Sequence, residues 1–177
     1  VVDKTTDFTF RAFKPNGLPG DIYKCSFIAS DYSPAVADVK CEKAGLNAAW
    51  YDYTGPNCAG ITEAKLNGNY PVAGVMIPQE AKGNIGLVIT GYIDVPADGI
   101  YSFDLLSDDG SYLKIDDQMV VDNDGEHSPK ELSGQMALKA GLHKVEARYF
   151  DHNGGQLRLK VYDPAGNILE PANIFKN

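Results

Sequence analysis

Apolar and polar residues alternate clearly in the middle of the chain. Tyr101, Phe103 and Leu105 fall on one side of this pattern, and Ser102 and Asp104 lie between them on the other. Successive side chains of a β-strand leave opposite faces, so a period of two is typical of a strand that is half-buried. The pattern predicts a strand here with its aromatic and aliphatic face in the core.

The same alternation continues on both sides of this strand. Residues 85–95 place isoleucine, leucine, valine and one glycine on a single face. After the turn at Ser107–Gly110, Leu113 and Ile115 continue the inward set, and Met119 and Val121 follow another turn. The result is a predicted β-meander, in which two adjacent carboxylates, Asp108 and Asp109, stand in a loop between core-facing strands. We expect function to lie at this pair.

Further strand-like segments occur along the rest of the chain, at residues 8–13, 22–29, 44–53, 131–138, 142–150 and 157–161. Gly- and Pro-containing turns separate them, and no long helical period is present. Residues 54–82 are irregular, so we expect a long loop there with one helical turn near residues 63–65. Nine or ten short strands punctuated by turns predict an all-β fold, an antiparallel β-sandwich.

The chain is expected to divide near residue 43. Residues 1–43 are interpreted as an accessory β-hairpin, or the remnant of a preceding domain, followed by a polar linker at Ser30–Lys40. Residues 44–177 form the predicted sandwich. Val1-Val2 is not a native start, which indicates a mature fragment or an excised domain.

Composition excludes some classes of partner. The 177 residues carry a formal net charge of −8, whereas binding to nucleic acid or to an anionic membrane needs a positive surface. No apolar run approaches the roughly 20 residues of a membrane helix, so no membrane insertion is expected.

The three cysteines, Cys25, Cys41 and Cys58, are spaced too widely for a zinc knuckle. Two interpretations remain open. One is a disulfide, with Cys41–Cys58 as the first choice, and the other is a set of buried thiols that act as small hydrophobic side chains.

An ordered set of motifs supports a family resemblance. The motifs are Gly91–Phe103 (GYIDVPADGIYSF), Ser107–Ser111 (SDDGS), Val120–Asn123 (VVDN) and Glu146–Phe150 (EARYF). In this order they resemble the PA-fourteen domain, named after protective antigen, over about residues 44–170. Residues 8–17 resemble, over a much shorter stretch, the tail of a small β domain that follows the catalytic domain of bacterial hexosaminidases.

The resemblance implies a barrel-like β-sandwich of a kind found in glycosidases, adhesins, toxins and signalling proteins, many of which bind carbohydrate. In the fungal flocculin and adhesin branch, an Asp-Asp pair joined by a cis peptide binds calcium, which coordinates sugar hydroxyls. Asp108 and Asp109 match that pair. The branch also takes an Asn side chain from the loop that matches 151–156, where Asn153 is the first candidate and Gln156 the second.

Calcium prefers six to eight oxygen ligands, which two carboxylates and a facing loop can partly supply. The alternative is an ordinary turn whose carboxylates accept N–H groups of their own loop. Residues 122–126 superficially match an EF-hand loop but lack its twelfth-position glutamate and flanking helices. An acidic turn is the better interpretation there.

A catalytic role is not expected. Glycosidases use two carboxyl groups roughly 5–10 Å apart across a sugar ring, and no partner for the adjacent pair can be chosen. No nucleophile elbow is present, and no Cys lies in a nucleophile context. Surface loop positions explain His127 and His152 better than catalysis does.

The leading hypothesis is therefore a non-catalytic carbohydrate-binding module that uses calcium. Asp108, Asp109, Asn153 and Tyr112 would contact sugar, and Asp108, Asp109, Asn153 and Gln156 would hold the metal. Tyr112 is preferred over Tyr149 for stacking because the alternation points it outward. The second hypothesis is a structural or protein-interaction module of a larger secreted glycoside hydrolase or adhesin. Either one places the chain outside the cell, at the cell surface or in the periplasm, with a glycan or neighbouring domains as partners.

Overall fold

The structure is a computed structural model that describes residues 4–152 and 154–177, and it separates into two compact units between Asp31 and Tyr32. The first unit is a lone antiparallel hairpin of β1 (Thr6–Phe13) and β2 (Pro19–Phe27), with Thr6 opposite Phe27. This confirms the predicted accessory hairpin. The predicted linker at Ser30–Lys40 spans the boundary between the units.

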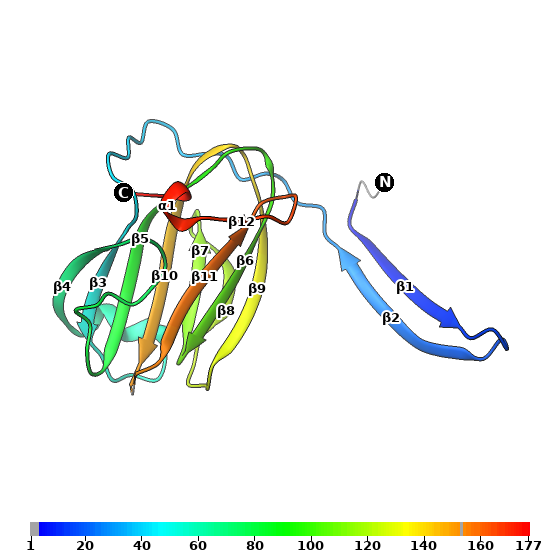
Figure 1. The fold of residues 1–177 in the computed structure, drawn as a ribbon, viewed down its shortest axis with the longest axis horizontal. Coiled ribbons are helices and arrows are strands. Elements are labelled where there is room, and N and C mark those ends of the chain that lie inside the picture. The colour runs from blue at the N-terminus through cyan, green and yellow to red at the C-terminus, as the bar shows by residue number, and fades with distance from the viewer. Residues whose placement is uncertain (1–3, 153) are drawn as a thin grey trace. The chain divides into compact units, whose positions relative to one another are not determined.

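The second unit is a β-sandwich of two antiparallel sheets (Figure 1). The larger sheet contains, in spatial order, β4 (Lys65–Val72), β3 (Leu46–Asp52), β5 (Ile85–Val95), β10 (Gly141–Asp151), β7 (Ser111–Ile115) and β8 (Gln118–Asn123), with β13 (Phe175–Lys176) also on β5. The smaller sheet contains β12 (Ile168–Leu169), β11 (Gln156–Tyr162), β6 (Gly99–Asp108) and β9 (Lys130–Leu138). The predicted all-β antiparallel sandwich is confirmed.

The core lies between the two sheets and follows the alternation in the sequence. Tyr101, Phe103 and Leu105 on β6 are fully buried, as are Leu113 and Ile115 on β7. Burying one large apolar side chain contributes about 1.5–3 kcal/mol, so this central set is a main source of stability. On β5 the predicted inward face is interrupted at Gly91, where a side chain would meet Leu46 at 2.6 Å.

The long loop predicted at residues 54–82 is wrong in part. It contains the 3-10 helix η1 (Cys58–Glu63) and the edge strand β4. An edge strand has a sheet neighbour on only one side, and most of β4 is exposed, so its sequence carries little apolar alternation. A short helix α1 (Pro171–Ile174) lies near the C-terminus, and no helix in the described ranges is long and apolar enough to span a membrane.

Residues 32–43 pack onto the sandwich rather than standing apart from it. The amide of Ser33 donates to the carbonyl of Ala137 at 2.8 Å, and that of Val36 donates to the carbonyl of Leu142 at 2.8 Å. Lys43 exchanges backbone hydrogen bonds with Asn177. This segment therefore belongs structurally to the second unit.

Candidate functional site

The loop of residues 108–110, here the carboxylate loop, crosses one end of the sandwich. Asp108 is the last residue of β6 in the smaller sheet, and Ser111 is the first residue of β7 in the larger one. Asp109 and Gly110 lie between them, and the peptide bond joining Asp108 to Asp109 is cis. The two carboxylates therefore stand where the chain passes from one sheet to the other.

The loop that follows β10 packs against the carboxylate loop. Gln156 lies directly opposite Asp108 in the β6–β11 register. A side chain at Gly155 would place its Cβ 1.7 Å from the carbonyl oxygen of Asp108, so only glycine allows this approach. Tyr149 donates its hydroxyl hydrogen bond to the same carbonyl at 2.7 Å. Gln156, the second-choice ligand, therefore lies across the strand pair from Asp108, and its role as a ligand stays a prediction.

Asp151 organises the loop from within. It is 3% exposed, and its carboxylate accepts the amides of Gly154 at 2.7 Å and Gly155 at 2.8 Å. Asn153, the first-choice amide ligand, lies outside the described residues, and its role stays a prediction.

The carboxylates of Asp108 and Asp109 differ from those of the other aspartates that are not solvent-exposed. Both residues are half-buried, yet within the part of the chain that the structure describes neither carboxylate accepts a hydrogen bond or forms an ion pair. The carboxylates of the other aspartates that are not exposed accept hydrogen bonds, namely those of Asp104, Asp116, Asp151 and Asp163. Among the residues that the structure describes, none compensates the two adjacent charges at this loop.

Three carboxylates act electrostatically on the hydroxyl of Tyr149. Burial raises the pKa of Tyr149, and the charges of Asp151, Asp108 and Asp109 raise it further. The phenol therefore remains a neutral donor to the carboxylate loop. Within residues 4–152 and 154–177, no group of three or more His, Cys, Asp or Glu side chains forms a metal cage by itself. A metal bound at the pair would need amide or backbone oxygens as further ligands.

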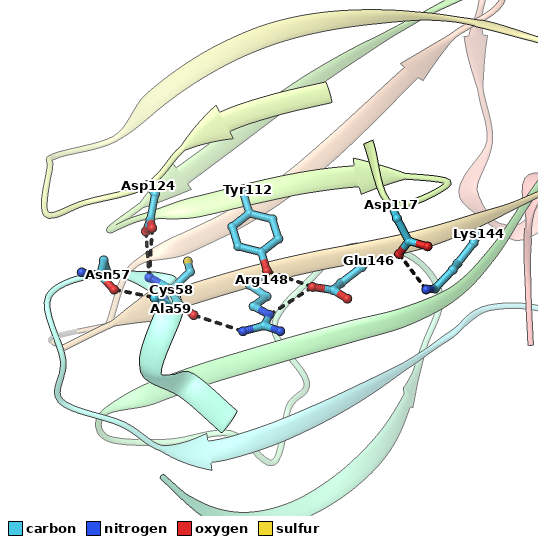
Figure 2. A network of polar contacts seen from close by, with 9 residues as sticks. All are labelled: Asn57, Cys58, Ala59, Tyr112, Asp117, Asp124, Lys144, Glu146 and Arg148. Atoms are coloured by element: carbon cyan, nitrogen blue, oxygen red, sulfur yellow. Dashed lines mark hydrogen bonds and ion pairs between the residues drawn. The ribbon is translucent and has the colours of Figure 1, made fainter. Parts of the chain in front are cut away.

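The η1 segment lies over Tyr112 and Arg148 of the larger sheet (Figure 2). The carboxylate of Asp124 accepts the amide of Cys58 at 2.9 and 3.1 Å, and Arg148 donates to the carbonyl of Cys58 at 3.4 Å. His152 hydrogen-bonds the carbonyl of Gly55 at 3.1 Å, which places residues 53–57 next to the loop after β10.

A family model, that of the PA14 domain, matches residues 42–172. The chain belongs to the PA14 domain family. The search of curated proteins finds no match.

Solved structures show the same fold at low identity. The PA14 sugar-binding domain from an RTX adhesin aligns at 18% identity with a TM-score of 0.65, over 77% of this chain and 99% of that one. The epithelial adhesin 9 A domain from Candida glabrata, in complex with Galb1-4GlcNAc, aligns at 12% identity with a TM-score of 0.61, over 75% and 89%. A β-glucosidase from Kluyveromyces marxianus aligns at 18% identity with a TM-score of 0.54, over 67% of this chain but 15% of that one.

Tyr112 of this PA14 domain does not offer the open ring face expected for stacking on sugar. The alternation does turn it to the outer face of the sheet, but it is only 8% exposed, in a cluster with Cys58 and Phe150 under η1. Its hydroxyl donates to Glu146 at 2.8 Å, and the guanidinium of Arg148 lies 5.8 Å from its ring centroid (Figure 2). The η1 segment, which is distant from Tyr112 in the sequence, packs over its ring, and the local alternation did not indicate this.

The cysteines are free thiols, so the Cys41–Cys58 disulfide is not formed in this PA14 domain. Cys58 is fully buried, and burial raises the pKa of its thiol, with the charge of Asp124 as the next cause. The alternative interpretation, a set of buried thiols, therefore holds for Cys58 but is wrong for Cys25, which is exposed, and Cys41 is only half-buried.

The acidic segment 122–126 is an ordinary turn. The carboxylate of Asp122 accepts the amide of Asp124 at 3.2 Å, and Asp124 accepts that of Gly125 at 2.9 Å. Asp124 also holds η1 through Cys58, so its role is to fasten a covering segment.

Proposed function

We propose that this PA14 domain is a non-catalytic carbohydrate-binding module that grips sugar through a calcium ion held by Asp108 and Asp109. The observation that carries the proposal is the pair of half-buried carboxylates without a partner among the described residues. Removing an unpaired carboxylate from water costs free energy, so buried charges are normally paired or ligate metals. A divalent cation compensates both charges at once.

The residues around the pair fit calcium better than a transition metal. The available donors are carboxylate and amide oxygens, which are the ligands that Ca²⁺ prefers, and no thiolate or imidazole cluster stands beside them in the described residues. Asp108, Asp109 and Gln156 would hold the ion, and Asn153 remains the expected further ligand. Bound calcium would neutralise the pair and accept sugar hydroxyls as additional ligands. Tyr149 and Gly155 fix the backbone that carries the first carboxylate.

Sugar as the ligand class draws support from structural relatives. One is a sugar-binding domain of an adhesin, and another was solved with Galb1-4GlcNAc bound. At 18% and 12% identity these matches establish the fold, so the ligand class is carried to this chain only within the proposal.

The setting we propose is extracellular, as part of an adhesin or as an accessory module of a secreted glycoside hydrolase. The β-glucosidase match favours the second setting, because there the aligned fold occupies a small part of a much longer enzyme chain. In such a module the carboxylates bind rather than cleave, because a glycosidase pair must flank the sugar ring from positions roughly 5–10 Å apart.

A glycan array tests this proposal. The second unit would be applied with calcium, with EGTA, and as Asp109→Asn with calcium, and circular dichroism would confirm that each sample is folded. We expect retained glycans only for the wild type with calcium. A folded wild type that retains no glycan in either buffer, or retains the same glycans in EGTA, would contradict the proposal and favour a structural or protein-interaction module.

A further inference from the structure

Three buried polar side chains lie directly behind the carboxylate loop. Ser107 precedes the loop and Ser111 follows it, and both are fully buried; Asn123, the last residue of β8, is 1% exposed. They occupy core positions between the two sheets, where the surrounding cluster is aliphatic and aromatic. They continue the inward sets of their strands, after Leu105 on β6 and before Leu113 on β7.

Hydrogen bonds join the three side chains into one unit, which we name the polar clamp. Ser111 Oγ donates to Ser107 Oγ at 2.7 Å, and Asn123 Nδ2 donates to Ser107 Oγ at 3.0 Å. Asn123 Nδ2 also donates to the carbonyl of Lys130, the first residue of β9, at 3.0 Å. Because β6 and β7 belong to different sheets, the bond between the serines ties together the two ends of the carboxylate loop.

The polar clamp stabilises the core less than apolar side chains of the same shape would. Asn123 Oδ1 is buried and has no hydrogen-bond partner among the described residues. Leaving a buried acceptor unpaired costs free energy, whereas replacing a whole polar set by apolar side chains of the same shape can be neutral or stabilising. Such exceptions are expected where the fold serves a site rather than its own stability.

The clamp and the contacts on the other side of the loop act on the same few atoms. Tyr149 and Gly155 fix the carbonyl of Asp108, and the carbonyl of Gly110 accepts the amide of Phe150 at 3.0 Å. The clamp restrains the loop from inside the core, immediately before Asp108 and immediately after Gly110. The backbone that carries both carboxylates is therefore held on both sides by residues other than the two aspartates.

We propose that Ser107, Ser111 and Asn123 are positioning residues that fix the Asp108 and Asp109 carboxylates in the geometry that binds the ligand. This inference rests on the proposed calcium site. Side chains that orient metal ligands typically change metal affinity about 10- to 100-fold when they are replaced.

The test compares Asn123→Leu and Ser111→Ala with Ser102→Ala as a matched control. Ser102 also lies on β6, but its hydroxyl accepts Gln135 at 2.9 Å, far along the strand from the loop. Two measurements are made on each protein: calcium affinity by titration calorimetry, and hydrogen exchange of peptides covering residues 104–113 in the metal-free state.

We expect Asn123→Leu and Ser111→Ala to raise the calcium dissociation constant at least about tenfold. We also expect faster exchange at the carboxylate loop in both variants. The melting temperature does not discriminate, because Asn123→Leu removes the unpaired Oδ1 but also the donor to the Lys130 carbonyl. Ser102→Ala should match the wild type in both measurements. A purely structural role would instead leave calcium affinity within about twofold of the wild type, whatever the melting temperature, which overturns the proposal.

The exchange measurement separates the two proposals. If the wild type binds no calcium, the calcium site fails, and the metal-free exchange rates still decide whether the clamp orders the loop. Unchanged exchange at residues 104–113 in both clamp variants overturns the clamp whatever the wild type binds. Ser111→Ala removes a single hydroxyl, so it keeps the test decisive if Asn123→Leu does not fold.

Discussion

Asp108→Asn should have opposite effects on stability in the absence and in the presence of calcium. In EGTA the two adjacent carboxylates repel each other, and at a separation on the order of 5 Å this repulsion is about 1–3 kcal/mol for effective dielectric constants between those of water and a protein surface. The Asp108 carboxylate accepts no hydrogen bond from the described residues, so the substitution removes repulsion without breaking a bond. We expect the metal-free variant to be more stable by about 1 kcal/mol.

Calcium should reverse the order. At a calcium concentration of about 100 times the dissociation constant, binding stabilises the wild type by about 2.7 kcal/mol. For a domain of this size 1 kcal/mol corresponds to a shift of about 2–4 °C, so the melting temperature of the wild type should rise by about 5–10 °C. Asp108→Asn should lose most of that rise. Differential scanning calorimetry in EGTA and in calcium measures all four values.

Asp163→Asn is the matched control, because the Asp163 carboxylate accepts the amides of Ala165 and Asn167 and the side-chain amide of Asn167. It should be destabilised in EGTA and keep the full calcium-dependent rise. The reasoning is refuted if Asp108→Asn also loses stability in EGTA, since the Asp108 carboxylate would then have partners of its own. It is equally refuted if that variant keeps the calcium-dependent rise.

Four further outcomes are expected. Gly155→Ala would place Cβ 1.7 Å from a carbonyl of the carboxylate loop, so it should abolish the calcium-dependent rise and cost on the order of 2 kcal/mol in urea denaturation. Tyr149→Phe removes the 2.7 Å hydrogen bond to the same carbonyl and should cost about 1 kcal/mol in the same assay. Burial raises the pKa of the Cys58 thiol, so iodoacetamide should label it only after unfolding, as peptide mass spectrometry would show. Hydrogen bonds to the Asp163 carboxylate lower its pKa, so its stabilising effect is present above the unfolded pKa of about 3.9 and is lost as pH falls through the folded value; Asp163→Asn should flatten the dependence of the urea midpoint on pH below about 4.

The strands that build the core were predictable because their signal is local. On β5, β6 and β7 a period of two places apolar side chains on one face, and the buried set follows that period. The edge strand β4 was missed because only one sheet neighbour constrains it, and its residues are mostly polar or exposed. The 3-10 helix η1 is held by hydrogen bonds to Asp124 and Arg148, which are distant in sequence, so no local pattern predicted it.

The site was predictable in part for the same reason. The sequence placed Asp108 and Asp109 in a loop between core strands, and the structure places them there, beside Gln156. The sequence could not show that η1 covers Tyr112. The alternation indicates that a side chain points to the outer face of the sheet, but it does not indicate what packs on that face. The polar clamp did leave a signal: Ser107 and Asn123 continue inward-facing sets, so polar side chains stand at core positions.

Calorimetric titration of calcium into the metal-free second unit tests the central claim most directly. The wild type should bind one calcium ion per chain, and the Asp108→Asn/Asp109→Asn double variant should bind none while remaining folded. Calcium binding of equal affinity and stoichiometry in the two proteins, or none in a folded wild type, would contradict the assignment of these two carboxylates to a ligand site.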